Sequence, residues 1–232
     1  IFSARVSNAL FILLLTLAVS RMLGPSLFGL YSFLTTVVVT ATCFSNYGLD
    51  TWMVREVAKA PDKGKFYLSN VLGLKMATSL VAVLLIIIAF RPASLLPTTE
   101  KLLWVLSLSL FFNSLAQTLW HYGDCFNKFI VHSILWSMTN LIKSSVGIIL
   151  LFLYTDLTPL IWGMVFAEAI ALLFSFYILK SRFGKISLSF DFQIWKEFLS
   201  RSTPMAWGAI FSALYFRLDV VMLQLMTKNE VV

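Results

Sequence analysis

The chain has 232 residues, of which 59% are hydrophobic and 12% are charged, and its mean hydropathy is +0.87. Soluble domains carry roughly 25% charged residues, so this composition excludes an ordinary soluble domain and predicts a multi-pass integral membrane protein. The formal net charge of +7 does not indicate nucleic acid as a partner, because Lys and Arg gather in the cytoplasmic loops of membrane proteins.

The apolar runs predict an all-α fold with about seven transmembrane helices, because each crossing needs roughly 20 apolar residues. Gly24-Pro25 separates the first two runs. Pro disfavours helical geometry in the residue before it and is tolerated in the first turn of a new helix, which predicts a tight helical hairpin here. The predicted spans are 2–22, 27–49, 68–90, 102–121, 129–154, 160–179 and a seventh from near Pro204 to about Met226.

These spans divide the chain into two unequal parts. Residues 1–180 are the predicted N-terminal transmembrane bundle, 181–201 a cytoplasmic or interfacial linker, and 202–232 the first helix of a truncated second bundle. The polar segment 50–67 is expected to be an exposed loop. The chain opens at Ile1 inside an apolar run and ends without a tail, so we expect it to be truncated at both ends.

The linker carries apolar residues with helical spacing, namely Phe192, Trp195, Phe198 and Leu199. This pattern predicts a short amphipathic helix that lies at the membrane interface. Lys and Arg are concentrated in this linker and in the other even-numbered connections. The first end of the chain and the even-numbered loops are therefore predicted to face the cytoplasm.

Several ionisable residues fall within or beside the predicted spans. A charge at mid-membrane costs roughly 2.5–3.5 kcal/mol on insertion scales, so it usually faces a partner or a water-filled cavity. One interpretation is that these residues pair internally, for instance Lys143 with Glu168, and hold the bundle together. The other is that they line a cavity. The candidates are Arg5, Asp50, Lys75, Lys143, Glu168, Arg217 and Asp219.

Polar stripes on the predicted helices favour the cavity. Asn140, Lys143, Ser144 and Gly147 share one face of the fifth span. Asn113, Gln117 and His121 follow each other at steps of four in the fourth. Together with similar pairs in the third and seventh spans they predict an aqueous cavity between the helices, although Asn and Gln also serve as interhelical hydrogen-bonding residues.

Enzymatic and metal chemistry find little support in the sequence. Cys43 and Cys125 have no CxxC spacing, and His121 and His132 have no metal-like partners at ligand spacing. The chain has no P-loop, GxSxG or HExxH motif. We therefore expect neither an enzyme nor a cofactor or metal, and structural or interfacial roles for the two histidines.

Short motifs identify a family resemblance. The hairpin 21–31 (RMLGPSLFGLY), the segment Asn46–Asp50 with Arg55–Ala58, and the seventh-span motifs Ser202-Thr203-Pro204 and 215–223 (YFRLDVVML) occur in this order. This layout resembles the polysaccharide flippases, the O-antigen and lipid-linked oligosaccharide exporters of the multidrug/oligosaccharidyl-lipid/polysaccharide exporter superfamily. The resemblance implies about 12–14 helices in two bundles around a central cavity, with alternating access.

The resemblance also implies a function. The protein would move undecaprenyl-pyrophosphate-linked oligosaccharide from the cytoplasmic to the outer leaflet of a bacterial or archaeal cytoplasmic membrane, for the synthesis of O-antigen, capsule or exopolysaccharide. Membrane lipids and a polysaccharide polymerase would be its further partners. Lys and Arg suit the pyrophosphate, which implies substrate binding by Arg5, Lys75, Lys143 and Arg217. The acidic residues would orient these cations or carry coupling ions: Asp50, Glu168 and Asp219.

Three other functions stay open. A multidrug or cation antiporter of the same superfamily would favour acidic residues in the cavity, whereas Lys75, Lys143 and Arg217 outnumber Glu168 and Asp219. A membrane polysaccharide polymerase or ligase would be expected to carry a long extracytoplasmic loop, and the predicted outward loops are short. The third is a membrane scaffold that does not transport.

Overall fold

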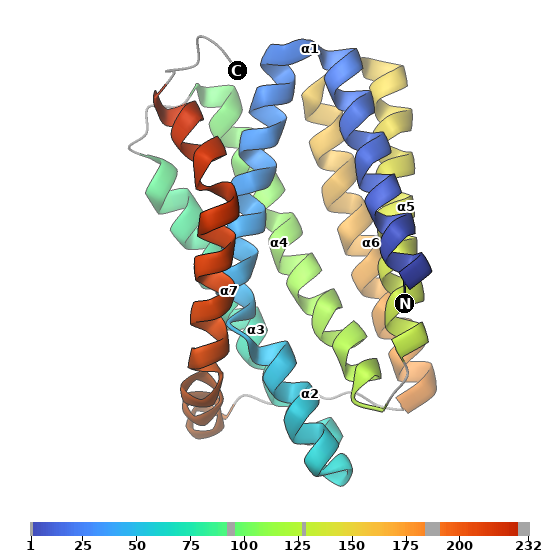
Figure 1. Cartoon of the computed structure of the whole chain (residues 1–232), viewed down its shortest axis with the longest axis vertical. Helices are drawn as coiled ribbons and strands as arrows, with labels where there is room; N and C mark the ends of the chain where they lie inside the picture. The colour runs from blue at the N-terminus through green and yellow to red at the C-terminus, as the bar shows by residue number, and fades with distance from the viewer. Residues whose placement is uncertain (1, 92–95, 127–128, 184–190, 227–232) are drawn as a thin grey trace.

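The computed structural model describes residues 2–91, 96–126, 129–183 and 191–226, and this part of the chain is helical without strands. Figure 1 shows the helices as a bundle in which most run along the long axis. This confirms the predicted all-α membrane fold. The helices are α1 (Phe2–Asn46), α2 (Leu49–Lys59), α3 (Gly64–Phe90), α4 (Pro97–Asp124), α5 (Phe129–Tyr154), α6 (Leu157–Phe183) and α7 (Phe192–Met226), with a 3-10 turn at Pro61–Lys63.

The predicted hairpin is the sharp bend within α1. Gly24 has φ 76° and ψ 176° there, whereas Pro25 begins the second arm. Glycine adopts a positive φ without the steric cost of a Cβ. Figure 1 shows α1 turning back at the top of the molecule, with its first arm beside α5 and its second arm near α4 and α7. The two arms match the first two predicted spans.

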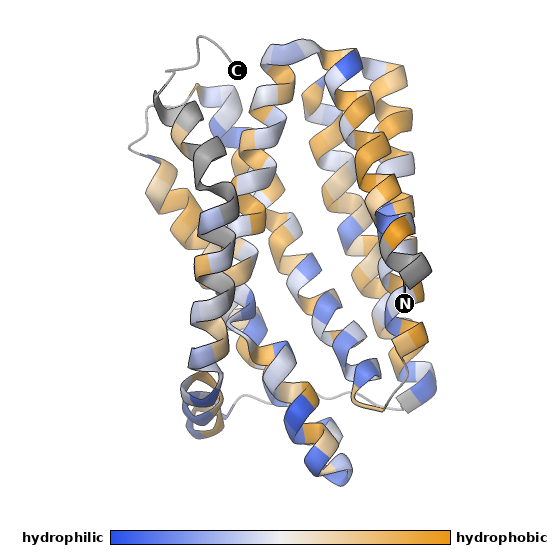
Figure 2. Cartoon of the chain, viewed as in Figure 1, coloured by the Kyte–Doolittle hydropathy of each residue, from blue (hydrophilic) through white to orange (hydrophobic). Residues whose placement is uncertain are grey.

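Within the described ranges, five helical segments are long and apolar enough to cross a membrane. The first, Val6–Lys59, contains both arms of α1 and therefore accounts for two crossings. The others correspond to α3, α4, α5 and α6, so the six spans of the predicted first bundle have helical counterparts. Large apolar side chains such as Phe152 and Leu173 are about 70% exposed (72% and 70%), and Figure 2 shows hydrophobic residues along much of the length of the helices. Such surfaces suit contact with lipid.

Two apolar cores fill the bundle. One lies among the arms of α1 and the neighbouring ends of α3, α4 and α6, with Val19, Phe33 and Leu160 at its centre. The other joins α2 to α3, α4 and the start of α7 around Met53 and Leu119. Buried polar residues are set beside these cores, and these form the candidate sites described below.

The prediction of an exposed loop at 50–67 was wrong in two respects, because the segment is mostly helical and one face of its first part is buried, although most of its charged residues are exposed as expected. Residues Leu49–Lys59 form α2, in which Trp52, Met53 and Val57 are buried, while Arg55 is exposed. Apolar residues at helical spacing give this short helix one apolar face. Average polarity concealed that face, because the opposite face carries the charges.

The linker and the seventh span form one helix, whereas the sequence suggested two. The Asp191 carboxylate accepts hydrogen bonds from the amides of Gln193 (3.0 Å) and Ile194 (3.4 Å) and caps the start of α7. Pro204 lies inside this helix, although it was expected near the start of a separate helix. Figure 1 shows the first turns of α7 almost end-on at the foot of the molecule, before the helix rises beside α1. Residues 184–190 lie outside the described part.

The predicted amphipathic segment of the linker is helical, and it forms the first turns of α7. Its buried apolar side chains pack against other helices of the bundle. Phe198 is buried against Trp52 of α2, with ring centroids 4.1 Å apart. Gly48, with φ 69°, brings the α1–α2 turn close to α7, where an added Cβ would lie 2.8 Å from the Cβ of Met205. The first turns of α7 are therefore fastened to the first bundle by close packing.

Candidate functional site

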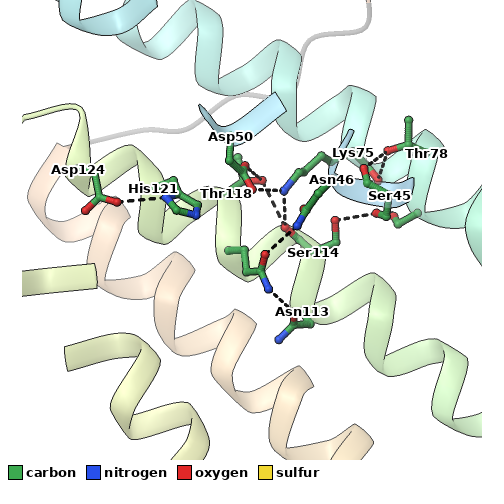
Figure 3. A network of polar contacts seen from close by, with 12 residues as sticks. Ser45, Asn46, Asp50, Lys75, Thr78, Asn113, Ser114, Thr118, His121 and Asp124 are labelled. Atoms are coloured by element: carbon green, nitrogen blue, oxygen red, sulfur yellow. Dashed lines mark hydrogen bonds and ion pairs between the residues drawn. The ribbon is translucent and has the colours of Figure 1, made fainter. Parts of the chain in front are cut away.

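The first buried polar cluster surrounds Lys75 of α3. The Lys75 ammonium donates to the Asp50 carboxylate at 2.6 Å and to the Ser114 carbonyl at 3.2 Å. Thr118 donates to the other Asp50 oxygen at 3.0 Å. Ser45 shares a hydrogen bond of 2.9 Å with the Ser114 hydroxyl. Figure 3 shows these side chains converging from α1, α2, α3 and α4.

This Lys75 cluster is closed to its surroundings. The Lys75 side chain is 0% exposed and that of Asp50 is 8% exposed. Burying a charge is tolerated when it is paired and fully hydrogen-bonded. The cluster therefore serves to fasten the C-terminal end of α1 and the start of α2 to α3 and α4. Lys75 and Asp50, both predicted site residues, are brought together here as an ion pair that a substrate cannot reach without opening the bundle.

A second chain of polar contacts reaches the surface. The Lys143 ammonium of α5 donates to Glu168 of α6 at 2.8 Å. Asn113 of α4 donates to the second Glu168 oxygen at 2.9 Å and accepts from Gln117 at 2.6 Å. The Gln117 carbonyl in turn accepts from Asn46 of α1 at 3.0 Å. We call these five residues the polar relay.

The polar relay differs from the Lys75 cluster in its access to solvent. The Lys143 side chain is 25% exposed, whereas that of Glu168 is 3% exposed. Asn113 and Gln117 are half-buried, and the Asn46 side-chain oxygen is buried without a hydrogen-bond partner among the described residues. The relay therefore offers a cation that can be approached and a spare acceptor at its far end. It is the candidate substrate or ion site of this bundle.

The polar stripe on α5 is divided between two neighbours. Asn140 donates to Asn8 of α1 at 3.0 Å, and the Ser144 hydroxyl donates to the Phe11 carbonyl at 2.9 Å. These residues fasten α5 to the first arm of α1, while Lys143 turns to α6. In the described part of the chain these stripe residues hydrogen-bond to neighbouring helices, and the aqueous cavity expected between the spans stays a prediction.

An open pocket of about 400 Å³ lies between α3, α4 and α6, and its lining is apolar. Lining residues include Leu72, Leu115 and Phe176. It contains none of the predicted site residues. Of those predicted residues, Arg5, Arg217 and Asp219 have side chains outside the described residues, so their roles stay predictions.

A third cluster lies where α4 ends and α5 begins. The Asp124 carboxylate contacts Nδ1 of His121 at 3.1 Å and Nδ1 of His132 at 2.6 Å. One ligand atom from each of the three residues lies within 4.8 Å of the others, an arrangement that fits a metal ion. The sequence analysis missed this cluster because His132 is close to the other two only through the α4–α5 turn. The HxxD spacing of His121 and Asp124 was its only local signal.

Comparison with known proteins gives a family and a fold. The family model described as "Polysaccharide biosynthesis protein" matches residues 1–232. No curated protein sequence matches significantly. Among solved structures, the crystal structure of MATE in complex with MaD3S is 18% identical, with a TM-score of 0.60 over 89% of this chain and 51% of that chain.

Two further structures share the fold. A MOP superfamily transporter from Pyrococcus furiosus, described as having a binding pocket of reverse polarity that suggests a different function, is 16% identical, with a TM-score of 0.58 over 91% of this chain and 50% of that one. An inward-facing multidrug resistance MATE transporter is 18% identical, with a TM-score of 0.53 over 94% of this chain and 53% of that one. The chain thus spans about half the length of these transporters. It belongs to the family described as "Polysaccharide biosynthesis protein", and its fold is similar to that of the transporters just named.

Proposed function

We propose that the chain forms the first bundle of a flippase that moves an undecaprenyl-pyrophosphate-linked oligosaccharide from the cytoplasmic to the outer leaflet. Membership of the polysaccharide biosynthesis family supports the substrate class. The fold shared with MOP transporters supports alternating access between two bundles. Its location would be a bacterial or archaeal cytoplasmic membrane, with even-numbered loops on the cytoplasmic side and a polysaccharide polymerase as a further partner.

The observation that carries this proposal is the partial exposure of Lys143 within the membrane bundle. Its ammonium is held by Glu168 at 2.8 Å, yet a quarter of the side chain is exposed (25%). An ammonium with three donors can keep the Glu168 contact and still donate to a phosphate oxygen. Lys75 has no such freedom, since it is enclosed and bonded to Asp50. Arg5 and Arg217 remain further candidates for the pyrophosphate, and Asp219 for coupling or orientation.

The experiment replaces Lys143 in the full-length protein. Surface polysaccharide is measured in cells that lack the native copy, with the membrane level of each variant quantified. Loss of a charged hydrogen bond costs ~1.5–3 kcal/mol, which corresponds to a roughly 10–150-fold weaker interaction. Lys143→Gln should therefore reduce export strongly, and Lys143→Arg should retain more of it. Lys101→Gln, at an exposed position on α4, is the matched control.

The result that overturns the proposal is wild-type export in Lys143→Gln at a normal membrane level. A second function is favoured by one observation, the fold likeness to MATE multidrug transporters. A multidrug or cation antiporter would need the carboxylate of the Lys143–Glu168 pair more than its ammonium. In that case Glu168→Gln would abolish efflux of a cationic dye, whereas a flippase would keep dye efflux low in every variant.

A further inference from the structure

The turn between α4 and α5 gathers three metal-ligating side chains outside the polar relay. His121 and Asp124 lie in the last turn of α4, and His132 lies in the first turn of α5. Figure 3 shows His121 and Asp124 facing each other on that part of α4, away from Lys75. The imidazole rings of His121 and His132 are 4.7 Å apart between centroids and meet edge to face. Two helices thus contribute to one compact group.

The spacing of the ligand atoms is close to that of a metal site. A tetrahedral ion with metal–ligand distances of ~2.0–2.1 Å holds its ligand atoms roughly 3.3 Å apart. The Oδ2 atom of Asp124 is 3.1 Å from Nδ1 of His121 and 2.6 Å from Nδ1 of His132. The Asp124–His121 distance is already close to this value. The Asp124–His132 distance would have to lengthen by less than an ångström. Small side-chain rotations in this turn would supply it.

A second observation points to a ligand. The Asp124 side chain is nine-tenths buried (10% exposed), and its Oδ1 atom is buried without a hydrogen-bond partner among the described residues. A buried carboxylate oxygen without a partner is costly. Coordination would satisfy it, either directly or through a metal-bound water. His121 and His132 are 34% and 22% exposed, so an ion can enter from the end of the bundle.

We propose that His121, Asp124 and His132 bind one divalent transition-metal ion of the Zn²⁺ class, which links the end of α4 to the start of α5. Two imidazoles and one carboxylate suit Zn²⁺, Co²⁺ and Ni²⁺. Mg²⁺ and Ca²⁺ prefer all-oxygen sites and should not compete. Three protein ligands leave a fourth position for water. The site shares no residue with the polar relay, so it adds to the proposed transport function and does not depend on it.

The test measures Co²⁺ binding to the purified full-length protein, prepared with an affinity tag that contains no histidine. Tetrahedral Co²⁺ with nitrogen and oxygen ligands gives a visible ligand-field absorption, and Zn²⁺ should displace it. We expect one Co²⁺ per chain, displaced by Zn²⁺ and unaffected by millimolar Mg²⁺. His132→Ala and Asp124→Asn should each weaken binding by at least ~10-fold, since even the loss of an outer-shell partner costs 10–100-fold.

The control variant is Glu197→Gln, which removes an exposed carboxylate on α7 (side chain 53% exposed) and should leave Co²⁺ binding unchanged. The proposal is overturned if the wild-type protein gives no Co²⁺ absorption or Zn²⁺ binding, or if His132→Ala binds Co²⁺ as tightly as the wild type. The wild-type measurement decides the question even where a variant fails to fold.

Discussion

Removal of one member of the Lys75–Asp50 pair should destabilise the bundle more than any other single charge change among the described residues. Lys75 is 0% exposed and its ammonium makes hydrogen bonds of 2.6 Å and 3.2 Å. Lys75→Met would leave the Asp50 carboxylate with Thr118 as its remaining described side-chain partner. Breaking a buried ion pair in this way costs ~3–5 kcal/mol, because the remaining charge is buried and uncompensated.

The assay is thermal unfolding of the full-length protein in detergent, followed by tryptophan fluorescence. For a unit of this size each kcal/mol shifts Tm by ~2–4 °C, so Lys75→Met should lower Tm by roughly 6–20 °C. The double variant Asp50→Asn with Lys75→Met should recover much of this loss, because it removes both charges. Lys101→Met, at an exposed position, should change little. A Tm for Lys75→Met within ~2 °C of wild type would refute the reasoning.

Two further predictions test the packing at the end of the bundle that carries α2. Gly48→Ala should lower Tm, since φ at this position is 69° and the added Cβ would lie 2.8 Å from that of Met205; an unchanged Tm would show that α7 can move away freely. In a Cys43→Ser background, Cys125 should react slowly with a water-soluble maleimide at pH 7.5 and fully after denaturation. Burial raises the pKa of its thiol to about 12, which leaves little reactive thiolate below that pH; equal rates before and after denaturation would contradict this.

The sequence was sufficient for features encoded by neighbouring residues. Gly24-Pro25 predicted the hairpin of α1 because these two residues restrict or permit backbone conformations at the turn itself. The structure has φ 76° at Gly24. The apolar runs predicted the six spans for the same local reason. The apolar face of α2 was also encoded, through Trp52, Met53 and Val57, but a test of average polarity did not reveal it.

The candidate sites could be predicted only in part. Lys143 and Glu168 were named as one possible pair, and the structure joins them at 2.8 Å. The substrate-binding role of Lys75 stays a prediction, and its pairing with Asp50, which lies 25 positions away at the start of α2, is not visible in the sequence. Contacts of this kind depend on how helices pack. No spacing rule within one helix reveals them.

The cluster of His121, Asp124 and His132 was likewise not predicted, because its residues come from two helices. Ligand spacing within one helix indicated no metal site, because His132 belongs to α5 and His121 to α4. The helical hairpin brings the two side chains to the same carboxylate of Asp124. A search of residues that flank predicted helix–helix turns, rather than of residues within each helix, would have found the cluster.

The number of positive and negative residues within the membrane is a poor guide to the charge of the substrate, because the two intramembrane lysines described above are each paired with a carboxylate. Lys143 is balanced by Glu168 and Lys75 by Asp50, so the excess of cations in the sequence does not create a positive site by itself. What distinguishes the two proposed functions is which member of the exposed pair the substrate needs. An anionic pyrophosphate requires the ammonium of Lys143 and tolerates Glu168→Gln, which would release that ammonium from its partner. A cationic substrate requires the carboxylate and tolerates Lys143→Gln. Opposite outcomes in these two variants therefore separate a flippase from an antiporter, while equal loss in both would show that the pair acts as a unit and that the substrate is held elsewhere.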